Sequence, residues 1–252
     1  MSGRPALAPP GVDAAIWHDV ECSSYDVDLS LWRELADESA GPVLELGCGT
    51  GRVALDLAAR GHEVTGLDSD AELVTALGER ASERGLPARG VVGDVRSFAL
   101  GRRFDLAVLP MQVVQLLRGR GQRASMLAAA SSHLEPGAVL AIALADPLEG
   151  VPAGPITPPL PDVLERDGWV FSSIPVAVRE DAGAVVVERV REAVSPAGEL
   201  SRAEVTISLE RVTAAMMEQE GANAGYTVRP SRQVTATSEY VGTTVVLLEA
   251  PS

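Results

Sequence analysis

The chain has 252 residues, of which 46% are apolar and 22% charged, and its formal net charge is −14 (21 Lys and Arg against 35 Asp and Glu). This length suits one large domain, and the composition is that of an ordinary globular protein. The acidic balance and the lack of a basic block argue against a nucleic-acid partner, and no apolar run is long enough for a membrane span.

Cys22 and Cys48 are the only cysteines. Two thiols give neither a disulfide framework nor a metal cluster, so we expect a cytoplasmic protein without a metal site. Residues 1–12 lack the apolar stretch of a signal peptide and are expected to form a flexible tail.

From residue 29 to residue 146 the sequence alternates between helical and strand patterns. Apolar residues at helical spacing predict the helices, and short apolar runs predict the strands. Ser69 followed by Glu72 has the spacing of a capping box, which predicts the start of one helix. The predicted elements are a helix over 29–40, a strand over 42–46, a helix over 51–60, a strand over 62–68, a helix from Ser69 to about Arg84, strands over 88–94 and 104–110, a helix over 122–134 and a strand over 138–146.

The pattern changes after residue 146. The segment 151–161 carries five prolines and is expected to be an irregular loop. Three predicted strands with turn signals between them follow it, over 169–179, 184–194 and 200–212, and they indicate an antiparallel sheet. A helix over 213–224 and strands over 226–236 and 242–250 close the chain.

These elements predict an α/β fold of the Rossmann-like, doubly wound type. Strands that alternate with helices form a mostly parallel sheet covered on both faces, here with seven strands. We therefore expect one domain over 13–252, in which 151–212 is an inserted loop followed by a three-stranded antiparallel sheet.

The segment VLELGCGTG (43–51) places three glycines at every second position after the first strand of the sheet. Ligands of such sheets bind outside the carboxyl ends of the strands, where glycines permit close approach of the backbone. A dinucleotide fingerprint needs a glycine at position 52, where this chain has Arg52. Asp68 and Asp94 close the next two strands, where a carboxylate can accept from ribose hydroxyls or a base.

On these residues the chain resembles the class I S-adenosylmethionine-dependent methyltransferases, over about residues 30–146 and the closing helix and strands. The resemblance implies S-adenosylmethionine as the cofactor, with the glycines around its methionine part, Glu45 ordering their loop, and Asp68 on the ribose. Asp94 would accept from the adenine amine. The implied cofactor-binding residues are Tyr25, Glu45, Gly47, Cys48, Gly49, Gly51, Asp68, Ser69, Asp94, Val95, Leu109 and Met111.

The acceptor side is less specific. The chain has LPMQ (109–112) where nucleic-acid and protein-amide methyltransferases carry an NPPY or DPPY tetrad. The inserted sheet resembles that of enzymes acting on glycine or amino sugars, where it roofs the active site or forms a dimer interface. Candidates for a catalytic base are Asp146, His18 and Tyr25, and the last two also lie, with Trp17, in a predicted lid over residues 12–28. Candidate substrate residues are Trp17, Gln112, Gln115, Trp169 and Arg179.

The sequence thus predicts methyl transfer from S-adenosylmethionine to a small-molecule acceptor, with a homodimer as one arrangement. Two alternatives stay open at this point. One is an enzyme of the same fold with different chemistry, and the other is a protein that binds the cofactor without turnover, because a fold does not fix a function.

Overall fold

The computed structural model describes residues 14–146 and 160–251. The predicted tail over 1–12 and most of the proline-rich loop over 151–161 therefore lie outside the described residues. The chain divides into two compact units, one made of residues 1–25 and 147–209 and the other of residues 26–146 and 210–252. We call them the insert unit and the sheet unit. The prediction that 13–252 works as a single domain stays a prediction.

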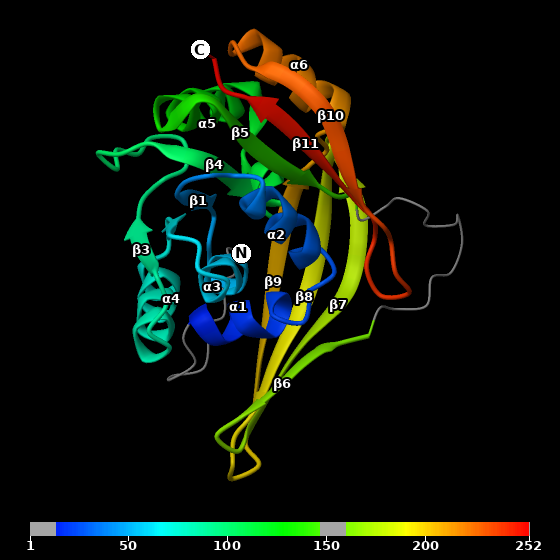
Figure 1. Cartoon of the computed structure of the whole chain (residues 1–252). Helices are drawn as coiled ribbons and strands as arrows, with labels where there is room; N and C mark the ends of the chain where they lie inside the picture. Colours follow the sequence, from blue (N-terminus) through cyan, green and yellow to red (C-terminus); the bar gives the residue numbers. More distant parts are fainter. Residues whose placement is uncertain (1–13, 147–159, 252) are drawn as a thin grey trace. The chain divides into compact units, whose positions relative to one another are not determined.

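The sheet unit contains a seven-stranded sheet with the order β10-β11-β5-β4-β1-β2-β3 (Figure 1). Only β11 runs antiparallel to its neighbours β5 and β10. This arrangement confirms the predicted mostly parallel, doubly wound sheet. Its strands are β1 (Val43–Leu46), β2 (Val64–Asp68), β3 (Ala88–Val92), β4 (Phe104–Leu109), β5 (Leu134–Leu144), β10 (Thr227–Val234) and β11 (Thr243–Glu249).

Helices cover both faces of this sheet, which explains why its central strands are apolar on both sides. One buried cluster joins α5 and α6 to one face through Met126, Leu127 and Met217. The other cluster joins α2, α3 and α4 to the opposite face through Trp32, Leu57 and Leu77. The helices of this unit are α2 (Leu29–Asp37), α3 (Arg52–Ala59), α4 (Ala71–Glu83), the 3₁₀ helix η1 (Val113–Leu116), α5 (Gly119–Ser132) and α6 (Ala214–Asn223).

The start of α4 differs from the prediction in one detail. Asp70, not Ser69, is the capping residue, and its carboxylate accepts hydrogen bonds from the amides of Glu72 and Leu73. Asp70 is the capping residue because its carboxylate reaches two of the free amides of the first helical turn, and its negative charge suits the helix N-terminus.

The insert unit contains a four-stranded antiparallel sheet with the order β6-β7-β8-β9. Its elements are α1 (Ala14–Cys22), β6 (Asp162–Arg166), β7 (Trp169–Asp181), β8 (Ala184–Val194) and β9 (Leu200–Glu210). The predicted count of three strands is wrong, because β6 is a short edge strand with little apolar content. In the sequence, the pair Asp167-Gly168 was the sign of this strand. The pair forms the two-residue loop of the hairpin between β6 and β7, with φ of 52° and 78°.

The helix α1 packs on one face of the antiparallel sheet. Trp17 and Val20 of α1 form a buried cluster with Phe171 of β7 and Ala193 of β8. The N-terminal segment therefore folds with residues that follow it by about 150 positions in the sequence.

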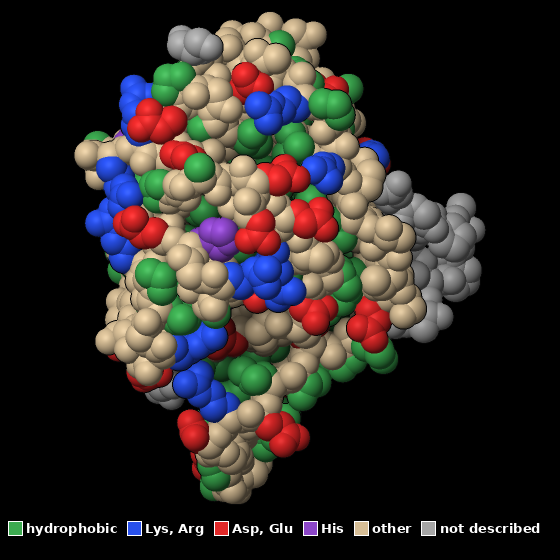
Figure 2. Space-filling view, viewed as in Figure 1, with side chains coloured by type: hydrophobic (Ala, Val, Ile, Leu, Met, Phe, Trp, Pro, Cys, Tyr) green, Lys and Arg blue, Asp and Glu red, His purple; other side chains and the backbone are tan. Residues whose placement is uncertain are grey.

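Charged side chains of both signs are interspersed on the face in Figure 2, with no large patch of a single sign. All of the blue groups are arginines, because the sequence contains no lysine. Within the described residues no helix is long and apolar enough to cross a membrane.

Candidate functional site

The glycine loop after β1 has a backbone that other residues rarely adopt. Gly47, Gly49 and Gly51 have φ values of 78°, 52° and 93°. The amides of Gly47 and Cys48 both donate to the carbonyl oxygen of Leu67, at 2.8 and 3.0 Å. A Cβ atom on Gly47 would lie 2.6 Å from Cγ2 of Val113. The loop therefore needs glycine twice over, for its left-handed turns and for its contact with η1.

Asp68 at the end of β2 holds the glycine loop. One carboxylate oxygen accepts from the amide of Gly49 at 2.9 Å, and the other accepts from the amide of Asp70 at 3.0 Å. An ionised carboxylate offers about four acceptor positions, so two remain for a ligand with hydroxyl donors. Asp68 thus combines loop support with the predicted contact to a ribose.

Cys48 is buried in the same loop, with its side chain against Gly66 of β2. Burial raises the pKa of its thiol, so the sulfur is not a nucleophile at neutral pH. The residue fills a tight space between the loop and β2, so any cofactor contact it makes would be a packing contact.

Glu45 in the middle of β1 is a buried carboxyl group below the loop. Burial raises its pKa to about 8, although the positive charge of Arg52 and a hydrogen bond from the amide of Ala54 act in the opposite direction. Its Oε2 atom has no hydrogen-bond partner among the described residues. At neutral pH this carboxyl group is therefore mainly protonated, and it supports the loop as a neutral group.

Arg52 explains why the chain departs from the dinucleotide fingerprint. Its guanidinium forms two hydrogen bonds with the buried carboxylate of Asp28, at 2.6 and 2.8 Å. The indole nitrogen of Trp32 donates to the same carboxylate at 2.8 Å. This network ties the start of α3 to α2, so the residue after the third glycine anchors the loop. The sequence did not predict this network, and the one signal for it was an arginine at a glycine position of the fingerprint.

Asp94, after β3, is held ionised by a neighbouring arginine. The side chain of Arg96 hydrogen-bonds both carboxylate oxygens, and its amide donates to Oδ1 at 2.8 Å. These bonds lower the pKa of Asp94 to about 2. Ser69 is exposed and Val95 is half-buried, so both are accessible at this edge of the sheet.

The loop after β4 carries the remaining predicted cofactor residues. Leu109 is fully buried at the end of the strand, and Met111 has a φ of 56°. A left-handed methionine is uncommon and marks a backbone held by its surroundings. Gln112 is half-buried, whereas the side chain of Gln115 is buried and bonded to the backbone of Ala145.

The strand order places these loops side by side. The strands β4, β1, β2 and β3 are neighbours and run parallel, so the loops that follow them meet at one edge. The bond from Gly49 to Asp68 and the contact between Gly47 and Val113 confirm that three of the loops touch. Of the predicted cofactor residues only Tyr25 belongs to the insert unit. The binding roles of all of them stay predictions.

Several predicted acceptor residues lie in the insert unit. Trp17 is buried with its ring edge-on to Phe171, at 5.8 Å between ring centroids, and Trp169 stacks on the same ring at 5.9 Å. Arg179 is exposed and pairs with Asp181 and Glu188 at 3.1 and 3.2 Å. These contacts account for the three side chains within their own unit.

The candidates for a catalytic base divide between the two units. His18 and Tyr25 lie in the insert unit, where His18 is half-buried and Tyr25 is buried. Asp146, at the end of β5 in the sheet unit, forms an ion pair with Arg211 at 2.8 Å. No group of three His, Cys, Asp or Glu side chains suited to a metal ion occurs among the described residues.

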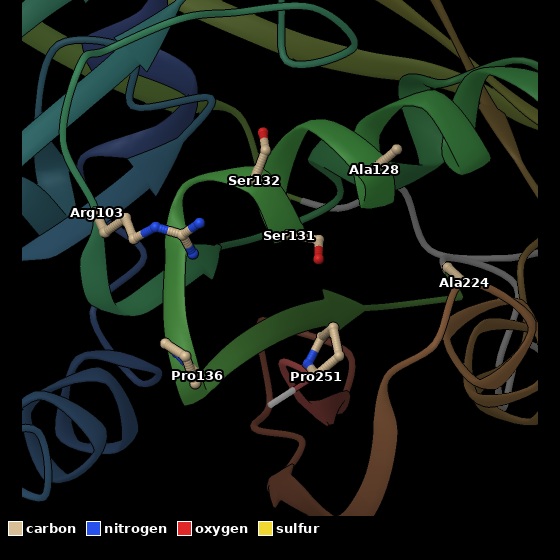
Figure 3. A pocket seen from close by; sticks show the side chains of 7 residues that line it. All are labelled: Arg103, Ala128, Ser131, Ser132, Pro136, Ala224 and Pro251. Carbon is tan, nitrogen blue, oxygen red and sulfur yellow. The ribbon is translucent and has the colours of Figure 1, made fainter.

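A shallow hollow of about 500 Å³ lies elsewhere on the sheet unit. Figure 3 shows the side chains around it, among them Arg103 before β4 and Pro136 near the start of β5. These residues stand at the opposite edge of the sheet from the glycine loop. Parallel sheets bind their ligands at the carboxyl edge, so this hollow is not the candidate site.

The comparisons with known proteins agree with this geometry. Residues 43–137 match the family described as "Methyltransferase domain". The chain is 30% identical to the cypemycin N-terminal methyltransferase of a Streptomyces species over 112 residues, 44% of this chain and 45% of that protein. It is 28% identical to the dTDP-3-amino-3,4,6-trideoxy-alpha-D-glucopyranose N,N-dimethyltransferase of Streptomyces venezuelae over 141 residues, 56% of each. The chain thus spans about half the length of these curated relatives.

Two solved structures share the fold over nearly the whole chain. The sugar N-methyltransferase KedS8 of Streptoalloteichus superposes with a TM-score of 0.77 at 17% identity, over 100% of this chain and 99% of that one. DesVI of Streptomyces venezuelae gives 0.74 at 22% identity, over 96% and 99%. The resemblance to the class I S-adenosylmethionine-dependent methyltransferases that the sequence predicts is confirmed.

Proposed function

We propose that this protein transfers the methyl group of S-adenosylmethionine to an amine nitrogen of a small molecule. The observation that carries the proposal is the glycine loop, locked to Asp68 and flanked by an ionised Asp94 at the carboxyl edge of the sheet. The relatives named above support nitrogen as the atom that accepts the methyl group, since their names describe transfer to nitrogen.

The residues of the sheet unit divide the binding of the cofactor between them. The backbone of the glycine loop would hold the methionine part, and Asp68 would accept from the ribose hydroxyls. Asp94 would accept from the adenine amine, with the Val95 amide beside the ring. The carbonyl of Leu109 and the side chain of Met111 would face the amino group and the sulfonium.

When bound, S-adenosylmethionine supplies an electrophilic methyl group. In the transfer a nitrogen–carbon bond forms, the carbon–sulfur bond breaks, and the sulfur keeps the electron pair as a neutral thioether. The protein aligns the amine and excludes water, and the amine must be in its neutral form. A proton leaves the methylated nitrogen afterwards, and Asp146, His18 and Tyr25 are the proposed acceptors.

The insert unit supplies the acceptor side in this proposal. Residues 12–28 would act as a lid, with Trp17, Trp169, Arg179, Gln112 and Gln115 as acceptor contacts. We further propose a homodimer in the reducing cytoplasm. The compartment is supported by the state of the two cysteines, neither of which forms a disulfide. Size-exclusion chromatography with light scattering tests the dimer, and fractionation of the producing cells tests the compartment.

Two measurements test the function. S-adenosylmethionine at a hundred times its Kd should stabilise the fold by about 2.7 kcal/mol, whereas NAD should not. A donor with a radioactive methyl group, incubated with amino sugars, free amino acids and short peptides, should give a labelled amine and S-adenosylhomocysteine. A product of another kind would instead identify non-methyl chemistry. Binding without turnover across a broad panel would indicate a non-catalytic binding protein, and labelled RNA or protein from an extract would contradict the small-molecule acceptor.

A further inference from the structure

The chain passes between the two units three times, once from Tyr25 to Asp26 and twice at the ends of residues 147–209. The last two connections leave and rejoin the sheet unit next to one another. The chain leaves the sheet unit after Asp146, at the end of β5, and returns at Glu210. The carboxylate of Asp146 pairs with Arg211 at 2.8 Å, so the two connections are joined directly. All of these atoms belong to the sheet unit, as do those in the contacts that follow.

Gln115 of η1 holds both connections with one buried side chain. Its amide nitrogen donates to the carbonyl oxygen of Ala145 at 2.9 Å and to that of Glu210 at 3.4 Å. Its amide oxygen accepts from the amide of Ala145 at 3.0 Å. A carboxamide donates through its nitrogen and accepts through its oxygen, so this one side chain can make all three bonds.

The carboxylate of Glu210 fixes the returning connection a second time. It accepts from the amide of Gly119 and pairs with the buried guanidinium of Arg123 at 3.0 Å. Arg123 also forms two hydrogen bonds of 2.8 Å with Glu220 of α6. The returning chain is thereby attached to η1, α5 and α6 before it continues.

The other side of η1 rests on the glycine loop. A Cβ atom on Gly47 would meet both methyl groups of Val113, at 2.6 and 2.7 Å, so this side chain lies against the loop backbone. One turn of 3₁₀ helix therefore contacts the glycine loop through Val113 and the two connections through Gln115. Packed contacts of this kind transmit a displacement because they leave no space to absorb it.

We propose that η1 couples the glycine loop to the insert unit, and that Gln115 is the positioning residue of this coupling. The inference rests on the proposed function, because it takes S-adenosylhomocysteine as a ligand of the glycine loop. A ligand that orders the loop restrains Val113, and through Gln115 it restrains both connections. Residues 169–194 of the insert unit then exchange their amide hydrogens more slowly, although the proposed cofactor contacts other than Tyr25 lie in the sheet unit.

Hydrogen exchange with and without S-adenosylhomocysteine tests the coupling. In the unaltered protein the ligand should slow exchange both in residues 43–57 and in residues 169–194. Allosteric couplings typically amount to about 5–150-fold, so a slowing of at least about fivefold is expected in β7 and β8. In Gln115→Met, which keeps the side-chain length but removes the three hydrogen bonds, the ligand should still protect 43–57 and no longer protect 169–194.

Two further variants separate coupling from simple loss of stability. Tyr226→Phe removes the buried hydrogen bond to Leu127, at 2.8 Å, and should leave the protection of 169–194 intact. Arg211→Met removes the partly exposed pair with Asp146 and should reduce that protection even if Gln115→Met fails to fold.

Two outcomes would overturn the coupling. In one, the ligand still protects residues 169–194 in both Gln115→Met and Arg211→Met. In the other, the ligand does not protect these residues in the unaltered protein. If S-adenosylhomocysteine neither binds in calorimetry nor protects 43–57, the proposed function falls, and this inference falls with it.

Discussion

The interactions that stabilise the sheet unit internally differ from those that stabilise the insert unit. In the sheet unit, helices pack on both faces through large apolar clusters, and the polar network around Arg52 joins the start of α3 to α2. In the insert unit, α1 is attached to the sheet by a small apolar cluster and a network of charges. Glu21 accepts from Ser173 and from Arg191 at 2.7 Å, while Arg189 pairs with Asp162.

The difference separates the unit that contains the family match from the unit that lies outside it. The family match over residues 43–137 falls wholly within the sheet unit, which carries the glycine loop and both acids. Under the proposed function, cofactor binding depends on backbone geometry and dense packing, which tolerate little change. The acceptor side depends on pairs of charged side chains, which can be exchanged without rebuilding a core. The four predictions below test this contrast, beginning with the largest effect.

Replacing Gly47 by alanine should damage the sheet unit most. The left-handed backbone costs a non-glycine residue about 1–2 kcal/mol, and the clash with Val113 adds about 1–3 kcal/mol. In a chain of this size the melting temperature should fall by about 4–20 °C. The matched control is Gly61→Ala, where φ is 97° but no atom lies within 4 Å, so only the smaller strain remains. If calorimetry shows that both variants lower the melting temperature equally, the contact between Gly47 and η1 is not tight.

Glu45 should make the stability of the sheet unit depend on pH. Its pKa is about 8 in the folded protein, above the value of 4.5 for the free side chain. The folded state therefore keeps a proton that the unfolded state releases, so stability falls as pH rises from about 4.5 to 8 and then levels off. The loss is on the order of 4 kcal/mol. In Glu45→Gln the free energy of unfolding, measured with urea at pH 5 and pH 8, should no longer show this dependence on pH. If it falls with pH as much as in the unaltered protein, Glu45 is not the group responsible.

Glu21→Ala should release α1 from the insert unit. Burial opposes the charge of Glu21, but the hydrogen bonds from Arg191 and Ser173 outweigh it and lower its pKa. Removing Glu21 leaves two partly buried arginines without this partner, at a cost of about 2–3 kcal/mol. Exchange of the α1 amides should therefore quicken. The exposed pair of Glu188 with Arg179 offers the control, because Glu188→Ala should cost less than about 1 kcal/mol. Similar exchange in both variants would refute the charged attachment.

Asp68→Asn should weaken the binding of S-adenosylhomocysteine about 10- to 100-fold, since a hydrogen bond to a charged group contributes about 1.5–3 kcal/mol. The asparagine keeps one acceptor for the loop amides, so the fold should survive. Asp70→Asn is the control, because asparagine caps a helix as well as aspartate does. The affinities of the unaltered protein, Asp68→Asn and Asp70→Asn for S-adenosylhomocysteine are compared by calorimetric titration. An unchanged affinity in Asp68→Asn would show that this carboxylate does not bind the ligand.

The sheet unit was largely predictable because its signals are local. Apolar strands, helix periodicity and the glycine loop each lie within a few residues, and Asp68 and Asp94 stand where parallel strands end. The networks of Arg52 with Asp28 and of Gln115 with Ala145 were not predictable, because each joins residues 24 or 30 positions apart through side chains. The packing of α1 on the antiparallel sheet was not predictable either, since Glu21 and its partner Arg191 are 170 positions apart in the sequence.

The distance in sequence between α1 and its partners has a consequence for biosynthesis. The ribosome releases α1 among the first residues of the chain, but Ser173 and Arg191 follow 152 and 170 residues later. At 5–20 residues per second, the helix waits roughly 10–30 s before its sheet exists. A nine-residue helix is unstable alone, so for that interval Trp17 and Ile16 are exposed to chaperones. The insert unit therefore forms only after residues 26–146 of the sheet unit have emerged, and the sheet unit is completed later still, by α6, β10 and β11.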